Sequence, residues 1–285
     1  MIPIGSLMLI PSGGLANRMR SIASAYTLAQ QVGIGLQVIW FQDWAVNAPF
    51  SSIFMPTSNL PLRDATLSDM LVYDRARRRN LWLPALAQRL LFERRLHEDT
   101  ILSLMDQKFD FVGWVRGHYC YISSYMDFYP YDSLLLHELF VPVREITEAV
   151  SRNREQLGST RSIGIHIRRT DHVVSILKSP TSLFVDKMKE ETDRHDDTKF
   201  YLATDSNEVK YKLKSIFGSR IVTPDAEARR DNIEGIRGGL VDMYTLASTS
   251  KIYGSQGSSF SKMASRLGNI ELRQLENGKE NLYTY

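Results

Sequence analysis

The sequence predicts an α/β fold made of two doubly wound, parallel-stranded domains that face each other across a cleft. Two observations lead to this prediction. Short apolar runs typical of buried strands alternate with longer segments of helical periodicity along most of the chain. The strongest polar motifs each follow directly on such an apolar run. In open parallel sheets, ligands bind at this carboxyl end of the strands.

The first half opens with a strand, a turn and a helix. Residues 7–11 are apolar, Gly13 and Gly14 are typical of a turn, and residues 18–32 have helical spacing that Gly33 ends. Further strands are predicted at residues 36–41 and 109–115.

The second half repeats the pattern with fewer interruptions. Strands are predicted at residues 162–167, 200–203, 220–223 and 251–254, and helices at 240–247 and 260–267. The polar helical segment 144–156 suits a link between domains. The predicted domains are therefore residues 1–145 and a Rossmann-type domain of residues 146–285.

Composition limits the class of protein. Of the 285 residues, 43% are hydrophobic and 24% charged, which is typical of a globular chain. Basic residues (35) nearly balance acidic ones (32), which argues against nucleic-acid binding. Cys120 is the single cysteine, so the chain has no intramolecular disulfide and no cysteine-based zinc site. Residues 1–12 indicate a buried strand rather than a secretion signal. We therefore expect a cytoplasmic protein.

The strongest motif is Ile-Gly-Ile-His-Ile-Arg-Arg-Thr-Asp at residues 163–171. Strand alternation places His166 and Arg168 on one face. Two adjacent arginines, Arg168 and Arg169, at a strand end are costly to leave without a counter-charge. A pyrophosphate would pair them through bidentate hydrogen bonds, and carboxylates such as Asp171 are the structural alternative.

Two glycine- or serine-rich turns precede helices, at residues 13–18 and 254–261. Backbone amides at a helix N-terminus form an anion site, although such turns also serve only as turns or caps. Asp205, after the strand at 200–203, binds a ribose or caps the next helix. The dinucleotide and P-loop glycine patterns are missing, which argues against a nicotinamide enzyme or a P-loop ATPase.

Metal chemistry is not expected. The sequence contains no Asp-x-Asp pair, and the histidines, including His166 and His172, are scattered. A transferase that lacks a cation needs arginines to neutralise a departing diphosphate. The motif at residues 163–171 supplies them.

In combination, these motifs resemble the fucosyltransferase superfamily, which includes the α1,6 enzymes of nodulation and of N-glycan cores, the α1,2 enzymes and the protein O-fucosyltransferases. The turn at 13–18 is similar to its G-G-x-x-N-[RQ] signature, and residues 166–171 to its H-x-R-R-x-D signature. Residues 201–205, and residues 238–247 followed by 258–260, resemble its remaining signatures. The resemblance covers most of the C-terminal half but only about the first thirty residues of the N-terminal half.

The resemblance implies a GT-B fold and an inverting, metal-independent transfer of fucose from GDP-β-L-fucose to a glycan acceptor. Arg168, supported by Arg169, would hold the diphosphate, and Asn17 would face the reacting centre. The other donor-site residues expected from the motifs and the resemblance are Gly14, His166, Asp205, Asp242, Ser258, Ser259 and Phe260, with Asp242 binding guanine.

The chain departs from the family at one point. Glycan-core enzymes carry a carboxylate several residues after the arginine motif, whereas residues 172–176 contain no acid. Asp171 or His172 remains as a candidate general base, or the reaction needs little base assistance. The alternatives to fucosyl transfer are another GDP-sugar or nucleotide-sugar transferase, or a non-catalytic phosphate- or nucleotide-binding relative.

A basic stretch, Arg75 to Arg95, mixes seven arginines with leucines and aromatic residues. One interpretation is a basic amphipathic surface that contacts anionic lipid, which would place the protein peripherally at the inner face of the membrane, near a lipid-linked acceptor. The other is a solvated helix packed on the N-terminal domain.

Overall fold

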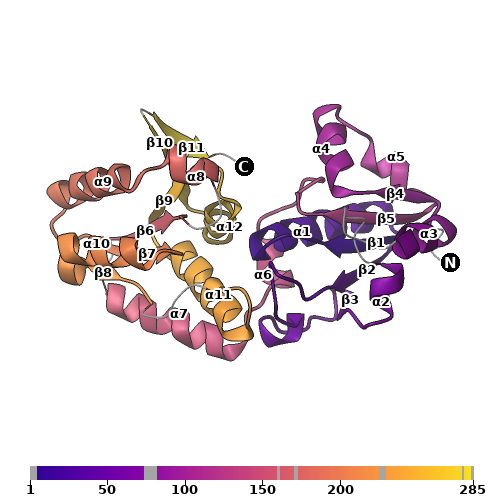
Figure 1. Cartoon of the computed structure of the whole chain (residues 1–285), viewed down its shortest axis with the longest axis horizontal. Helices are drawn as coiled ribbons and strands as arrows, with labels where there is room; N and C mark the ends of the chain where they lie inside the picture. Colours follow the sequence, from indigo (N-terminus) through magenta and orange to yellow (C-terminus); the bar gives the residue numbers. More distant parts are fainter. Residues whose placement is uncertain are drawn as a thin grey trace. The chain divides into compact units, whose positions relative to one another are not determined.

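The computed structural model describes residues 5–73, 82–158, 161–169, 173–224, 229–277 and 279–283. The chain divides into two compact units, Met1–Val141 (unit 1) and Pro142–Tyr285 (unit 2), and each is described by itself (Figure 1). The predicted boundary after Glu145 falls inside a helix that packs within unit 2.

Within its described residues, unit 1 holds a five-stranded parallel sheet in the order β3-β2-β1-β5-β4. Its strands are β1 (Ser6–Pro11), β2 (Gly35–Trp40), β3 (Leu62–Asp64), β4 (Arg94–Leu96) and β5 (Tyr119–Ser124). Its helices are α1 (Leu15–Val32), α2 (Asp69–Val72), α3 (Trp82–Leu91), α4 (Glu98–Asp106), α5 (Phe111–Val115) and α6 (Leu135–Leu139), with a 3-10 turn at Phe50–Ser52.

The first strand–turn–helix unit forms as predicted. Helix α1 ends at Gly33, whose φ of 73° lies in the left-handed region that glycine adopts without strain. Arg18 of α1 is fully buried, donates to the carbonyl oxygens of Gly13 and Phe41, and pairs with Asp43 at 2.8 Å. Its guanidinium therefore ties the β1–α1 turn to the end of β2.

The strand predicted at residues 109–115 is wrong. Asp110 accepts a hydrogen bond from the Gly113 amide and so caps the short helix α5. The strand of this region is β5, whose last residues, Ser123 and Ser124, are polar yet buried. The alternating apolar pattern of residues 109–115 matched a strand, but the local cap favours a helix.

The described residues of unit 2 form a six-stranded sheet in the order β11-β10-β9-β6-β7-β8. Its strands are β6 (Ser162–Ile167), β7 (Lys199–Thr204), β8 (Ile221–Val222), β9 (Lys251–Ser255), β10 (Glu271–Glu276) and β11 (Lys279–Tyr283). The last of these, β11, pairs antiparallel with β10, and the other pairs are parallel. The helices are α7 (Arg144–Leu157), α8 (Val173–Lys178), α9 (Thr181–Arg194), α10 (Asn207–Phe217), α11 (Ile233–Ala247) and α12 (Ser259–Gly268), with a 3-10 turn at Gly218–Arg220.

Helices cover both faces of this sheet. Ile163, Ile165 and Ile167 of β6 pack in one apolar cluster with α9 and α10. Helices α11 and α12 pack closely on the opposite face of the sheet, because two glycines stand where larger side chains would hold the helices away. A Cβ on Gly164 would lie 2.8 Å from Leu246 of α11, and one on Gly254 would lie 2.8 Å from Ser261 of α12. This face, beneath α11 and α12, carries the motif residues.

Among the residues that the structure describes, no helix is both long and apolar enough to cross a membrane.

Candidate functional site

The carboxyl edge of the unit 2 sheet gathers the polar motifs. Strands β6, β7 and β9 are neighbours in register, with Ala203 and Gly254 flanking His166. Arg168 follows β6, Asp205 follows β7, and the turn into α12 follows β9. Three segments that are far apart in the sequence therefore meet at one edge.

Arg168 is held at this edge by its neighbours. Its backbone amide donates to Ser255 Oγ at 3.1 Å, and its Nε lies 3.5 Å from Asp205 Oδ2. The Arg168 side chain is 19% exposed, so the guanidinium is oriented but accessible to a ligand. Ser255, which lies in the predicted turn at residues 254–261 but was not among the predicted site residues, fixes the backbone that carries this arginine.

Arg169 is turned toward the protein. Its guanidinium donates to the carbonyl oxygens of Arg168 and Ser179 and to Thr181 Oγ1. Its backbone amide donates to Asp205 Oδ1 at 2.6 Å. Burial lowers the pKa of Arg169, with Asp205 acting in the opposite direction. These contacts favour a positioning role, in which Arg169 shapes the loop around Arg168.

His166 is buried on the same face as Arg168 and stacks on Phe260 of α12, with the ring centroids 4.9 Å apart. Burial, aided by the charge of Arg168, lowers the pKa of His166 to about 3. The imidazole is therefore neutral at physiological pH, and its Nδ1 has no hydrogen-bond partner in the described structure.

The N-terminus of α12 adjoins His166. Ser258 is its N-cap, but the Ser258 side chain makes no capping hydrogen bond, and the first turn contains no acidic residue. Gly257 precedes the cap with a φ of 77°, which favours glycine. Ser259 and Phe260 form the first turn, so the backbone amides and the positive end of the helix dipole suit an anion.

Asp242 lies on α11, half-buried, and accepts a hydrogen bond from the Tyr201 hydroxyl at 2.7 Å. Burial raises the pKa of Asp242 to about 6, while Tyr201 and Lys210 act in the opposite direction. An anionic carboxylate that is partly desolvated is costly for stability, which is typical of functional positions.

Two glycines, Gly238 and Gly239, lie within one turn of Asp242 on α11. A Cβ at either position would meet nothing within 4 Å. Neither packing nor an unusual φ requires glycine there, although glycine in a helix costs up to about 1 kcal/mol relative to alanine. The helix backbone beside Asp242 is thus open to a flat ligand.

The glycine turn of unit 1 is described by itself. Gly13 has a φ of 75°, and a Cβ there would collide with the Asn17 side chain at 2.8 Å. Asn17 Oδ1 is buried and has no hydrogen-bond partner among the described residues. Gly14, the N-cap of α1, has open space where a Cβ would lie. This turn holds the polar amide of Asn17 at the carboxyl end of β1.

Two predicted catalytic residues, Asp171 and His172, lie outside the described residues. Among the residues that are described, no group of three or more His, Cys, Asp or Glu side chains is arranged to hold a metal ion.

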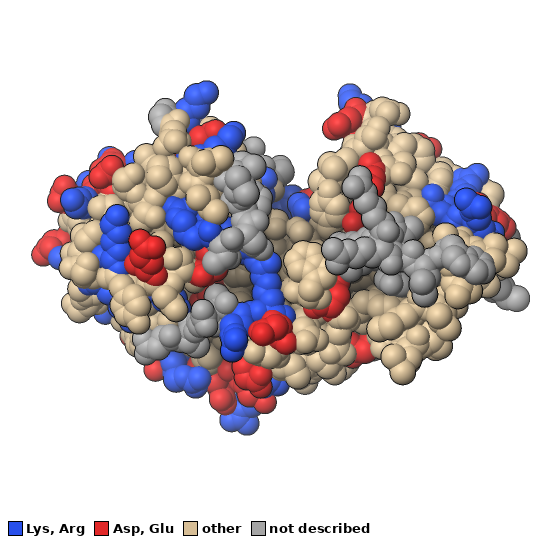
Figure 2. All heavy atoms as spheres, in the orientation of Figure 1, with Lys and Arg blue, Asp and Glu red and all other residues tan. Residues whose placement is uncertain are grey.

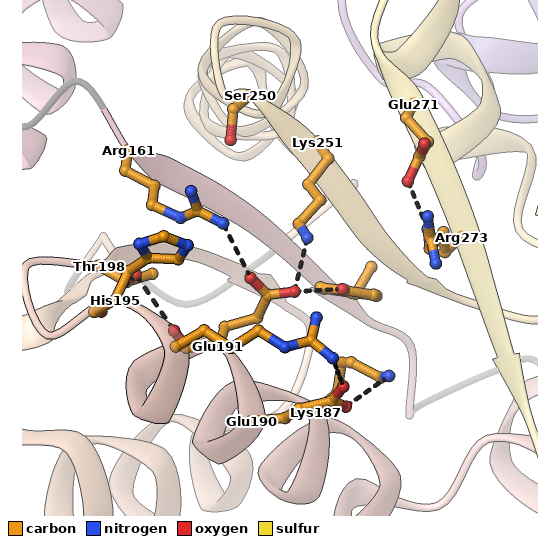
Figure 3. Close-up of polar contacts among 12 residues, drawn as sticks. Arg161, Lys187, Glu190, Glu191, His195, Thr198, Ser250, Lys251, Glu271 and Arg273 are labelled. Carbon is orange, nitrogen blue, oxygen red and sulfur yellow. Dashed lines mark hydrogen bonds and ion pairs between the residues drawn. The ribbon is translucent and has the colours of Figure 1, made fainter.

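A second charged cluster lies at the opposite, amino-terminal edge of the unit 2 sheet (Figure 3). Glu191 of α9 is fully buried and accepts hydrogen bonds from Lys251 Nζ at 2.5 Å and from the Tyr253 hydroxyl at 2.6 Å, while Arg161 lies 3.6 Å away. Burial raises the pKa of Glu191, but these donors outweigh it, so the net shift is downward. This geometry is that of a structural ion cluster that joins α9 to the sheet.

A pocket of about 630 Å³ borders this same edge, between the C-terminal ends of α7 and α11. Helix C-termini present carbonyl oxygens and disfavour anions. The pocket therefore does not suit a phosphate ligand, unlike the carboxyl edge.

Comparisons with known proteins agree with the geometry of the fold. No protein-family model matches the sequence, and no match to a curated protein was found. Comparison with solved structures shows that the chain has an α/β fold of the GT-B type found in fucosyltransferases, as predicted.

Three of the solved structures that this chain resembles illustrate the degree of similarity. The fucosyltransferase NodZ from Bradyrhizobium is 19% identical, with a TM-score of 0.66 and 98% of each chain covered. FUT1 from Arabidopsis thaliana, in complex with GDP, is 17% identical, with a TM-score of 0.60, covering 95% of this chain and 70% of that one. POFUT1 in complex with GDP-fucose is 9% identical, with a TM-score of 0.52 and 95% of both chains covered.

Proposed function

We propose that this protein is an inverting, metal-independent glycosyltransferase that transfers fucose from GDP-β-L-fucose to a glycan acceptor. One observation carries the proposal: an accessible arginine, a neutral histidine and an uncapped helix N-terminus converge at the carboxyl edge of the unit 2 sheet. The similar structures in complex with GDP or GDP-fucose support the choice of donor.

The diphosphate binds between Arg168 and the N-terminus of α12. A guanidinium pairs with phosphate oxygens through two parallel hydrogen bonds, and the backbone amides of Ser259 and Phe260 donate hydrogen bonds to the second phosphate. Asp205 orients Arg168 through Nε, so we assign Asp205 to positioning rather than to ribose binding. As the bond to fucose breaks, negative charge grows on the diphosphate, and these fixed donors stabilise it.

The guanine base of GDP binds along α11. Guanine presents two N–H donors, on N1 and on its amino group, that match the two oxygens of a carboxylate such as Asp242. Gly238 and Gly239 let the ring approach the helix backbone. His166, whose ring stacks on Phe260, contributes a polar ring nitrogen to the nucleotide site. Because this imidazole is neutral, it places no second positive charge beside Arg168.

Inversion requires attack of the acceptor hydroxyl on the anomeric carbon from the side opposite the diphosphate, in one displacement. We assign residues 1–145 to the acceptor side, with Asn17 facing the reacting centre, and residues 146–285 to the donor. A base that takes the hydroxyl proton, Asp171 or His172, would raise the rate by roughly 10²–10⁴-fold. A cytoplasmic location and a role in glycan biosynthesis are parts of the same proposal.

Thermal unfolding tests the donor assignment. The protein is melted with GDP, UDP, CMP or NAD, with and without a chelator, and as Arg168→Ala. A ligand at a hundred times its dissociation constant stabilises by about 2.7 kcal/mol, which raises the midpoint by several degrees. We expect a shift with GDP alone, unchanged by chelator and lost in Arg168→Ala. A larger shift with UDP contradicts the GDP assignment, and no shift with any nucleotide contradicts the donor site.

Transfer itself is tested with GDP-fucose and a panel of glycan acceptors, by detecting the fucosylated product. Release of GDP and fucose without any product, across the panel, would contradict the transferase assignment.

A further inference from the structure

A cavity of about 340 Å³ lies in unit 1, between α4, α5 and the segment that follows β5. Its lining includes four aromatic rings, those of Phe109, Phe111, Phe128 and Tyr129. Phe111 and Phe128 are buried, with their ring centroids 5.4 Å apart, whereas Phe109 and Tyr129 are half-buried. Small-molecule pockets have volumes of roughly 300–1,000 Å³, so this cavity is of a size for a single ring.

The segment after β5 places the cavity beside α1. Arg20 and Ser24 of α1 donate hydrogen bonds to the carbonyl oxygens of Tyr125 and Tyr129. Ser24 lies seven residues after Asn17, which is about 10 Å along the helix axis. The cavity is therefore separate from the glycine turn that holds Asn17, although both belong to unit 1.

Lys108, at the edge of the cavity, has an unusual backbone conformation. Its φ of 53° lies in the left-handed region. Its amide donates to the carbonyl of Met105, and the amide of Phe109 donates to that of Leu104, both at 3.0 Å, so α4 ends in a Schellman motif. Glycine is usual at this position, as Gly33 is at the end of α1, because a side chain there is strained.

No contact in the described part of the chain accounts for a strained lysine here. The Lys108 side chain is exposed and makes no hydrogen bond or ion pair with the described residues. Backbone strain of this kind is concentrated at ligand-binding positions. The Lys108 ammonium group is therefore available to a ligand in the cavity.

A carboxylate lies on the same edge of the cavity. Asp110 is exposed, and its Oδ1 accepts the amide of Gly113 at 2.9 Å as the cap of α5. Within the described residues, Asp110 and Lys108 form no ion pair with each other. Figure 2 shows charged side chains of both signs among uncharged residues over the part of unit 1 where α4 and α5 lie. The cavity thus combines aromatic rings with a cationic donor and an anionic acceptor.

We propose that this cavity binds one pyranose ring of the glycan acceptor, an inference that rests on the proposed glycosyl transfer. The faces of a sugar ring carry C–H groups, which the negative face of an aromatic ring attracts. Sugar hydroxyls both donate and accept hydrogen bonds, so they satisfy Lys108 and Asp110 together.

Other classes of ligand fit the cavity less well. An apolar ligand would desolvate both charged groups without replacing their hydrogen bonds to water. An anion would face Asp110, and a cation would face Lys108. A neutral, hydroxylated ring suits both. Because the cavity is about 10 Å along α1 from Asn17, an acceptor that fills it and also reaches the reacting centre is an oligosaccharide.

Saturation-transfer NMR of the whole protein with methyl glycosides of glucose, galactose, mannose, fucose and N-acetylglucosamine tests the proposal. We expect at least one glycoside to bind with about millimolar affinity, since one ring makes few contacts. Phe109→Leu keeps an apolar side chain but loses the flat face, and Lys108→Gly loses the donor. Each change should raise the dissociation constant of that glycoside at least about ten-fold.

Each variant has a matched control. Asn269→Gly changes the other described non-glycine residue with a positive φ, 47°, and Tyr211→Leu changes an aromatic residue of unit 2 that is 74% exposed. Both controls should bind the glycoside as the unaltered protein does. Glycine adopts a positive φ without strain, so neither Lys108→Gly nor Asn269→Gly should lower the unfolding midpoint.

The GDP-induced rise in the unfolding midpoint separates this inference from the proposed function. If GDP raises the midpoint but no glycoside binds, the sugar site is wrong and the donor site is unaffected. If a glycoside binds in the cavity but GDP has no effect, the donor assignment is wrong instead.

Three results would overturn the proposal. One is that no glycoside binds, and another is that the glycoside affinity is the same in Phe109→Leu and Lys108→Gly as in the unaltered protein. The third is that toluene binds and glycosides do not, which would assign the cavity to an apolar ligand.

Discussion

Replacing Asp242 by asparagine should make the protein more stable and at the same time impair GDP binding. Burial raises the pKa of Asp242 from 3.8 to about 6. Each unit of pKa shift corresponds to 1.36 kcal/mol, so the ionised carboxylate costs about 3 kcal/mol at neutral pH. Asparagine keeps the size and an oxygen that accepts the Tyr201 hydrogen bond, and it removes the charge.

The direction of the Asp242 pKa shift determines how the unfolding free energy depends on pH. Because the folded protein holds this proton more tightly than the unfolded chain, the Asp242 contribution to the unfolding free energy falls as pH rises from about 4 to 6. Asp242→Asn should therefore be more stable than the unaltered protein by about 3 kcal/mol at pH 7.5, with a smaller difference at pH 5. Denaturant titrations of both proteins at both pH values measure this difference.

Binding should change in the opposite direction. If the ionised carboxylate accepts two hydrogen bonds from guanine, its loss costs about 1.5–3 kcal/mol, or roughly 10- to 150-fold in the dissociation constant for GDP. In the unaltered protein GDP affinity should fall as pH drops below about 6, and Asp242→Asn should lack this dependence. Calorimetric titration with GDP measures both.

The reasoning is refuted if Asp242→Asn is less stable than the unaltered protein at pH 7.5, because the carboxylate then contributes stability. Tyr201→Phe is the matched control. It removes the hydroxyl donor that lowers the Asp242 pKa. The pH below which GDP affinity falls should therefore be higher in Tyr201→Phe than in the unaltered protein.

The remaining predictions concern three other positions. Gly238→Ala should stabilise α11 by about 0.5–1 kcal/mol, since the added methyl meets open space, yet weaken GDP binding; unchanged GDP affinity would show that the base does not approach this helix. Arg168→Lys keeps the charge but loses the planar fork, so the GDP dissociation constant should rise at least about ten-fold with little change in thermal stability, and an unchanged constant counts against bidentate diphosphate binding. Glu191→Gln leaves Arg161 and Lys251, which are 36% and 21% exposed, without their counter-charge and should cost about 1–3 kcal/mol in denaturant unfolding, whereas no measurable loss is incompatible with a structural ion cluster.

Several features were predictable from the sequence because they depend on local order along the chain. Strand β6 was placed at its observed residues, and the strand–turn–helix unit that ends at Gly33 was recovered from glycine positions and apolar periodicity. The shared face of His166 and Arg168 follows from alternation alone. The gathering of Asp205 and the turn before α12 at the same edge follows from the rule that parallel strands share a carboxyl edge.

Other features needed contacts between distant residues. The sequence could not tell that Arg169 turns inward while Arg168 stays accessible, because the carbonyl of Ser179 and the hydroxyl of Thr181 decide it. Strand β5 was missed, because its polar end is buried only by its position between β1 and β4 in the sheet.

By itself, then, the sequence determined the alternation of strands and helices, the class of fold and the residues that can meet an anion, since these follow from periodicity and from the chemistry of side chains. Tertiary structure decided the rest: which arginine is accessible, and which carboxylate is desolvated enough to raise its pKa. The burial and the electrostatic environment of a side chain depend on packing between segments that are distant in the sequence. Only the folded chain brings those segments together.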